Sequence, residues 1–297
     1  MADPNAFSTV VVPAAGLGTR FLPVTKSVPK ELLPVLNIPA IELVAAEAAQ
    51  AGAERLVIVT APGKESLARH FQPNPQLEDL LHACGKDALA QLVRRAPGLL
   101  SVETVVQETP LGLGHAVACA EPVLTGADDA VAVILPDDIL LPADTLTRMA
   151  AVRQDHGGTV MCAFTASRDR LGAYGVFDLE DATDTDAPRV RGMVEKPDPA
   201  LAPSTFACAG RYLLDRSVFE LLKRVRPGAR GEIDLTDAVV DAIAEGQPVH
   251  AIVHSGTRHD IGDPQGMLRA AVDFALSDPA ADPTLRDWLG RRLALPV

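Results

Sequence analysis

Aromatic residues make up only 4% of this 297-residue chain, so Val, Leu, Ile and Ala must build its core. The stacking platforms that a single-strand nucleic-acid binder needs are therefore scarce. Positive charge is also limited, because 27 Lys and Arg stand against 39 Asp and Glu, a net charge of -12. An acidic chain repels phosphate backbones and anionic membranes, which disfavours nucleic-acid and membrane partners. A phosphorylated substrate would need a local cluster of cations.

Long apolar runs are absent as well. No stretch approaches 18 uninterrupted apolar residues, and residues 1–8 contain Asp3 and no apolar run. The sequence therefore predicts neither a signal peptide nor a membrane span. Its four cysteines are far apart and form no C-x-x-C pair, which is typical of reduced core thiols. We expect a cytoplasmic protein.

The first half of the chain alternates between apolar runs and segments of helical period. Runs at 9–13, 55–60, 102–106 and 130–135 predict strands. Segments at 41–50, 77–94, 114–120 and 143–152 predict helices. Because strands that alternate with helices form parallel sheets with right-handed crossovers, this half predicts an α/β fold.

The second half predicts a change of sheet type. Its expected strands are 160–165, 174–179, 190–195, 206–214 and 249–254, the second and third forming an antiparallel pair. The connection 180–188 is rich in Asp and Thr and predicts a solvated loop. Thr236 or Asp234 is expected to cap a helix at 238–245, and a helical stretch follows from Pro264. No Gly/Ser linker divides the chain, which favours one domain with a sheet-rich insertion.

A glycine-rich loop follows the first predicted strand. The run Ala-Ala-Gly-Leu-Gly at 14–18 lets backbone N–H groups approach a nucleotide without Cβ interference. A dinucleotide-binding G-x-G-x-x-G is disfavoured because Phe21 stands at the third glycine, and the Lys and Ser/Thr of a P-loop are missing. Arg20, Lys26 and Lys30 follow closely and suit a triphosphate. A tight βα turn with surface cations is the alternative.

Two segments resemble the signature of sugar nucleotidyltransferases: Pro-Ala-Ala-Gly-Leu-Gly-Thr-Arg-Phe-Leu-Pro at 13–23 and Pro-Lys-Glu-Leu-Leu-Pro at 29–34. The wording is similar to that of bacterial UTP–glucose-1-phosphate uridylyltransferases. The resemblance implies that Arg20 and Lys30 bind the triphosphate and stabilise the reaction at the α-phosphorus. It implies further nucleotide-binding positions at Ala14, Ala15, Gly16, Gly18, Thr19 and Glu31.

The run Gln-Glu-Thr-Pro-Leu-Gly-Leu-Gly-His-Ala at 107–116 predicts a strand end, a turn and a helix start. A Gln carboxamide offers both a donor and an acceptor, so with backbone groups it complements the edge of uracil. The resemblance gives this base-reading role to Gln107 and the Gly112 backbone. An ordinary glycine-rich βα loop is the alternative, and His115 is expected to be a structural helix residue rather than a catalyst.

Adjacent carboxylates follow the apolar strand at 131–135, where ligands of α/β proteins bind. Mg²⁺ prefers one or two carboxylates plus phosphate oxygens. The resemblance assigns Mg²⁺ coordination to Asp137, while Asp138 shapes the loop or faces the sugar; a plain Asx turn is the alternative. Asp260, in Asp-Ile-Gly-Asp at 260–263, completes the metal site in related proteins, although a turn role also explains it. His259 stands where the family has an aromatic residue.

The sugar side is expected on the two arms of the antiparallel pair. The resemblance assigns the sugar hydroxyls to Glu195, the sugar phosphate to Lys196 and sugar contact to the Gly175 backbone. A charge pair in a loop is the plainer alternative. The segment Gly-Glu-Ile-Asp-Leu-Thr-Asp-Ala at 231–238 resembles a family segment that supports the site, with departures at Arg230 and Asp234.

These matches run in order from Val10 to about Ala270. They imply a Rossmann-like mixed, mostly parallel sheet flanked by helices, with parts at about 8–165 for the nucleotide, 166–263 for the sugar and 264–297 as a C-terminal helical segment. They imply a Mg²⁺-dependent enzyme that converts UTP and glucose 1-phosphate to UDP-glucose and pyrophosphate, and a homodimer or homotetramer with 264–293 as a candidate contact. Use of dTTP or another sugar, a non-catalytic nucleotide-sugar sensor and a dehydrogenase remain alternatives.

Overall fold

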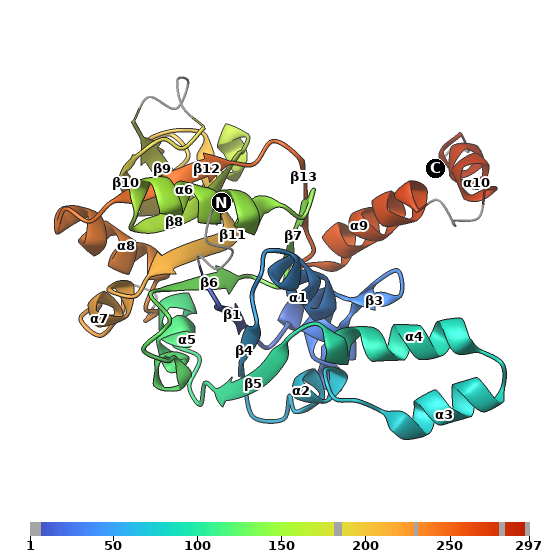
Figure 1. Ribbon diagram of the computed structural model, residues 1–297. Coiled ribbons are helices and arrows are strands. Elements are labelled where there is room, and N and C mark those ends of the chain that lie inside the picture. Colours follow the sequence, from blue (N-terminus) through green and yellow to red (C-terminus); the bar gives the residue numbers. More distant parts are fainter. Residues whose placement is uncertain (1–6, 181–185, 229–230, 279–282, 295–297) are drawn as a thin grey trace.

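A computed structural model describes residues 7–180, 186–228, 231–278 and 283–294 (Figure 1). Most of the loop predicted at 180–188, and the family departure at Arg230, lie outside the described residues. Within them, nine strands form one mixed sheet, whose main path has the order β10-β9-β11-β6-β1-β4-β5. Strand β8 pairs with β11 and β12 beside this path. The predicted α/β class is confirmed.

The half of the sheet that contains β1, β4, β5 and β6 is parallel. Strand β1 (Thr9–Pro13) lies between β4 (Arg55–Thr60) and β6 (Ala130–Ile134), and β5 (Ser101–Val106) pairs with β4. Because parallel strands point the same way, the chain leaves β1, β4, β5 and β6 at one common edge. This carboxyl edge is where the loops that follow these strands meet.

The second half of the sheet is largely antiparallel and centres on one long strand. Strand β11 (Phe206–Asp215) pairs antiparallel with β6, β8 (Thr159–Thr165) and β9 (Gly175–Leu179). Strand β10 (Val190–Glu195) forms the predicted antiparallel pair with β9, and β12 (Val249–Val253) runs parallel to β8. The sheet therefore continues without a break from the parallel half into the antiparallel half.

Two strand pairs were not predicted. Strand β7 (Asp138–Leu141) pairs antiparallel with β13 (Thr257–Asp260), so the strand predicted at 249–254 is not the last. Asp138, predicted in a loop, begins β7 and lies opposite Asp260. Strands β2 (Pro34–Val35) and β3 (Ile38–Pro39) form a small hairpin. Each partner is too short to show a period-two pattern, which explains why the sequence does not reveal them.

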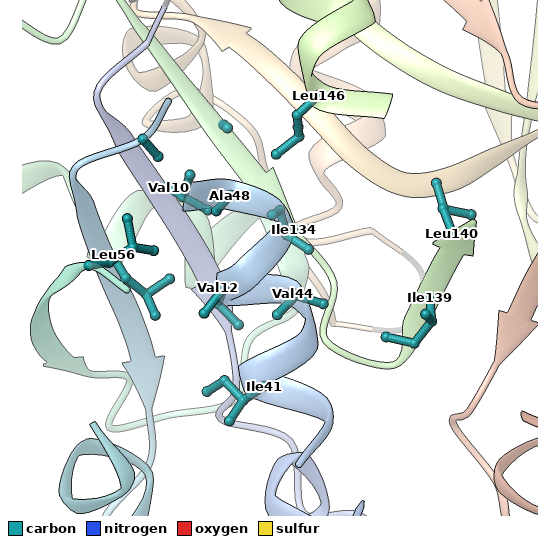
Figure 2. Close-up of a cluster of buried hydrophobic side chains, with 14 of the residues drawn as sticks. Val10, Val12, Ile41, Val44, Ala48, Leu56, Ile134, Ile139, Leu140 and Leu146 are labelled. Carbon is teal, nitrogen blue, oxygen red and sulfur yellow. The ribbon is translucent and has the colours of Figure 1, made fainter. Parts of the chain in front are cut away.

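Helices cover both faces of the sheet. Helix α1 (Ala40–Gln50) packs its apolar side on β1, β4 and β6, where Val10, Val12, Leu56 and Ile134 are fully buried (Figure 2). The opposite face carries α5 (Leu113–Cys119), α7 (Val218–Leu222) and α8 (Leu235–Ala244). The remaining helices are α2 (Ser66–His70), α3 (Pro75–Ala83), α4 (Asp87–Arg95), α6 (Thr145–His156), α9 (Pro264–Ser277) and α10 (Leu285–Leu293).

Two helices differ from the sequence prediction. The helix predicted at 77–94 is two, α3 and α4, which lie side by side and are separated by a turn in which Gly85 has φ 68° (Figure 1). Helix α8 begins three residues early, with Asp234 at its N-cap. Thr236 is therefore no cap and is free to bond elsewhere in the site. None of the described helices is long and apolar enough to cross a membrane.

The cysteine prediction is only partly correct. All four are free thiols, and Cys162 and Cys208 are buried as expected. Burial raises the pKa of Cys162 to about 12, so its thiol is inert at neutral pH. Cys84, however, is exposed in the turn between α3 and α4, and Cys119 is half-buried.

Candidate active site

A loop of residues 14–18, here called the glycine loop, leaves β1 at the carboxyl edge of the sheet. Gly18 has φ 64°, and a Cβ there would lie 3.1 Å from side-chain atoms of both Lys30 and Thr25. Both the conformation and the lack of space require glycine at this position. The predicted nucleotide-binding residues Ala14, Ala15, Gly16, Gly18 and Thr19 lie on this loop or directly after it.

Lys64, which the sequence analysis does not single out, binds the glycine loop through its side chain. Its Nζ donates to the carbonyl oxygens of Ala14 at 2.6 Å and Gly16 at 2.7 Å, and lies 3.0 Å from Oε2 of Glu31. Glu31, predicted to bind nucleotide, is 2% exposed and pairs with Lys64. Burial raises the pKa of Glu31 and lowers the pKa of Lys64 although each faces an opposite charge. Desolvation therefore outweighs their attraction, and neither charge tolerates loss of its partner.

We expect Lys64→Met to raise the KM for the nucleotide about tenfold and to lower the free energy of unfolding by about 2 kcal/mol. The substitution removes the donor to two loop carbonyls and leaves Glu31 buried without its cation. Steady-state kinetics and denaturant unfolding measure the two effects. Adding Glu31→Gln should restore part of the stability but not the KM. A double variant with normal KM would show that Lys64 does not shape the loop.

Four predicted catalytic and metal-binding side chains lie together beside the glycine loop, and we call Arg20, Lys30, Asp137 and Asp260 the cation–acid centre. The Nζ of Lys30 lies 2.5 Å from Oδ2 of Asp137. A Cβ placed on Gly262 would lie 3.1 Å from Oδ1 of Asp260. The same point is 3.5 Å from a guanidinium nitrogen of Arg20 and 3.5 Å from Oδ2 of Asp137. Segments far apart in the chain thus converge around one small residue.

The charge of Lys30 is held by its neighbours. Burial alone would lower the pKa of Lys30, but the facing carboxylate of Asp137, with Glu31 nearby, raises it overall. The ammonium group therefore stays protonated at neutral pH. Arg20 is exposed toward the same space. Two cations therefore lie beside the glycine loop of an otherwise acidic chain. This is the local arrangement that a phosphorylated ligand requires.

Asp138 is placed differently from its neighbour Asp137. It is 5% exposed and accepts a hydrogen bond from the amide of Gly210 at 2.8 Å. The Nε of Arg258 lies 2.8 Å from Oδ1 of Asp138, and the guanidinium stacks 4.1 Å from the centre of the Phe164 ring. Asp138 therefore joins β7, β11 and β13 beneath the centre. Asp138 does not line the cavity that contains Glu195 and Lys196. This geometry favours the loop-shaping alternative over sugar contact.

The loop of residues 107–112, here called the base-side loop after its predicted role, has a backbone that only glycine can adopt at one position. Gly112 has φ 103°, and a Cβ there would lie 2.8 Å from the carbonyl oxygen of Ile233. The amide of Ile233 donates to the carbonyl of Leu111 at 2.7 Å, so the segment from Gly231 closes over this loop. Gln107, at the end of β5, is 5% exposed. The segment that resembled a family support element is thus a direct packing partner of the loop.

The sugar-side residues line a cavity of about 250 Å³ between β9, β10, β11 and the start of α8. The Oγ1 of Thr236 donates to Oε2 of Glu195 at 2.8 Å, and the Nζ of Lys196 lies 3.0 Å from Oε1. A Cβ on Gly175 would lie 3.1 Å from the same carboxylate, so glycine leaves room there. Gly112 and Leu135 also line this cavity, which links it to the base-side loop and to the strand that leads to Asp137.

Known proteins resemble this chain along nearly its whole length. Residues 9–276 match the family described as Nucleotidyl transferase. The UTP–glucose-1-phosphate uridylyltransferase YngB of Bacillus subtilis (strain 168) is 38% identical over 270 residues, which cover 91% of this chain and 90% of that protein. A UTP–glucose-1-phosphate uridylyltransferase of Staphylococcus epidermidis is 36% identical over 94% of this chain and 96% of its own.

Solved structures agree with these relatives. A UTP-bound UGPase from Acinetobacter baumannii superposes with a TM-score of 0.86 at 33% identity, covering 98% of this chain and 100% of that one. A UDP-glucose pyrophosphorylase complexed with UDP-glucose gives a TM-score of 0.80 at 31% identity, over 92% of this chain and 100% of that one. The chain therefore belongs to the nucleotidyl transferase family and, within it, to the bacterial UTP–glucose-1-phosphate uridylyltransferases.

Proposed function

We propose that the chain transfers the uridylyl group of UTP to α-D-glucose 1-phosphate, giving UDP-glucose and pyrophosphate. The observation that carries this proposal is the convergence of Arg20 and Lys30 with two carboxylates beside the glycine loop. A cavity of about 250 Å³ contains Glu195, Lys196 and also Leu135, which stands two residues before Asp137. The full-length similarity to uridylyltransferases supports the choice of substrates.

The reaction needs positioning and charge neutralisation rather than a general base. The phosphate of the sugar is already an anion, so its oxygen attacks the α-phosphorus in line and pyrophosphate leaves. In our proposal Arg20 and Lys30 offset the charge that develops on the triphosphate. Lys196 holds the attacking phosphate, Glu195 accepts from the sugar hydroxyls, and the Gly175 backbone leaves the sugar room.

Mg²⁺ is part of the proposal, and the residues present fit it. A carboxylate oxygen of Asp137 and one of Asp260 both lie within 3.5 Å of the place where a Cβ on Gly262 would stand. Among the described residues no group of three or more His, Cys, Asp or Glu side chains could hold a metal ion. One or two carboxylates completed by substrate phosphates are the usual protein share of a Mg²⁺ site, unlike a closed cage. Asp137 and Asp260 would hold the ion, which would neutralise phosphate charge.

Purified protein mixed with UTP, glucose 1-phosphate and Mg²⁺ should release pyrophosphate and form UDP-glucose in equal amounts. We expect excess EDTA to reduce the rate at least about 100-fold and added Mg²⁺ to restore it, because the phosphate charge is then uncompensated. Parallel reactions with dTTP and with galactose- and mannose-1-phosphate set the selectivity. Folded protein that releases no pyrophosphate from any pair would favour the nucleotide-sugar sensor. Release from dTTP alone would keep the mechanism and change the nucleotide.

We further propose one domain, since the sheet passes through β11 from the nucleotide side to the sugar side.

Helices α9 and α10 extend away from the sheet (Figure 1) and expose Leu268, Trp288 and Leu293 by 66%, 51% and 85%. Such a surface suits contact with a second copy, as a homodimer or homotetramer. A monomer mass from light scattering at micromolar concentration would overturn this. We also propose a cytoplasmic location, because UTP is a cytoplasmic nucleotide.

A further inference from the structure

The carboxamide of Gln107 has its donor group fully used inside the protein. Its Nε2 lies 2.8 Å from Nδ1 of His115 and donates to the carbonyl oxygen of Gly112 at 3.3 Å. Within the described part of the chain, no hydrogen bond reaches its Oε1. Nor is Oε1 one of the fully buried atoms without a partner, so part of its surface is accessible. The protein thus consumes the two donor positions and leaves an acceptor.

The Gly112 carbonyl decides which way the carboxamide points. If the group were reversed, Oε1 would face that carbonyl oxygen at 3.3 Å, and two acceptors would oppose each other. With Nε2 in this place, Nδ1 of His115 must accept and therefore carries no proton. The proton of the neutral ring then lies on Nε2, which is 3.8 Å from Sγ of Cys119, one helical turn along α5. The contacts from the Gly112 carbonyl through Gln107 and His115 to Cys119 therefore form one consistent hydrogen-bond chain.

We propose that His115 is a positioning residue that sets the nucleobase preference by holding Oε1 of Gln107 outward as an acceptor. This inference rests on the proposed function, in which Gln107 reads the base. Uracil presents an N3–H donor between two carbonyls, and an outward Oε1 accepts that hydrogen. Cytosine presents an unprotonated N3 at the same place, which an outward Oε1 repels. Thymine has the same edge as uracil, so this device separates UTP and dTTP from CTP but not from each other.

The test compares variants that keep or lose an acceptor at the Nδ1 position. His115→Asn places Oδ1 where Nδ1 stands and keeps the acceptor, whereas His115→Leu and His115→Gln remove it from that place. We expect kcat/KM for UTP and dTTP to fall together by roughly tenfold in His115→Leu and His115→Gln, through KM. The preference for UTP over CTP should fall by a similar factor. His115→Asn should stay within about threefold of the unmodified chain on both measures.

Two outcomes would overturn the inference. One is an unchanged UTP-to-CTP ratio in both His115→Leu and His115→Gln, judged on whichever melts like the unmodified chain. The other is an equal loss in His115→Asn, which would mean that the ring fills space and its acceptor is irrelevant. Failure of the proposed function looks different, because the unmodified chain would then form no UDP-glucose from UTP. The unmodified protein is therefore assayed with all three nucleotides first.

Discussion

Lys30→Ala is expected to form UDP-glucose at least about 100-fold more slowly than the unmodified chain, mainly through kcat. Lys30 lies 2.5 Å from Asp137 and keeps its charge, since the facing carboxylate offsets the effect of burial on its pKa. Removing one cation that stabilises developing charge on a triphosphate costs roughly 3 kcal/mol of transition-state stabilisation. The measurement is pyrophosphate release at saturating UTP and glucose 1-phosphate.

The matched control is Lys86→Ala, which removes an exposed lysine in the turn between α3 and α4 and should change kcat less than twofold. Thermal melting of both variants checks that they fold. Arg20→Ala should fall by the same order as Lys30→Ala, because its guanidinium lies within the same centre. If Lys30→Ala melts normally and keeps more than a third of the kcat, Lys30 has no part in the chemical step.

The parallel half of the sheet could be predicted because each of its strands carries its own signal. The run Thr9–Pro13 and the run Arg55–Thr60 are short, apolar and β-branched, and both form strands with those bounds. Helix α1 differs from its prediction by one residue. The β7–β13 ribbon could not be predicted in the same way. Its strands have four residues each, which is too short to show a period of two.

The site was predictable where a motif brings its residues close in sequence, and less so where packing does. Arg20 and Lys30 follow the glycine loop in the same continuous motif, so their meeting there is expected from the motif. Lys64 follows a different strand, and only the fold brings its Nζ under Ala14 and Gly16. A lysine directly after Gly63 at a carboxyl strand end was the one available signal. Asp138 shows the reverse case, since its neighbour Asp137 faces the centre while its own side chain faces the interior.

The largest stability effect is expected from a pair that no motif contains. Arg211 on β11 is fully buried, and Nε and Nη2 contact the two carboxylate oxygens of Glu47 at 2.8 and 2.7 Å. Glu47 lies on α1 and is 4% exposed. Burial alone would lower the pKa of Arg211, but Glu47 raises it overall, so the guanidinium stays charged. Its Nη1 also donates to the carbonyl oxygen of Gly210 at 3.0 Å. The amide of the same glycine donates a hydrogen bond to Asp138.

We expect Glu47→Ala to lower the free energy of unfolding by about 3–5 kcal/mol, because a buried guanidinium then loses its hydrogen-bonded counter-charge. Denaturant unfolding measures this, with the exposed Glu54→Ala as control, expected within about 0.5 kcal/mol of the unmodified chain. The double variant Glu47→Leu with Arg211→Met removes both charges and should recover most of the loss. If Glu47→Ala loses less than about 1 kcal/mol, or the double variant is no more stable than the single one, an unpaired buried charge is not the cause.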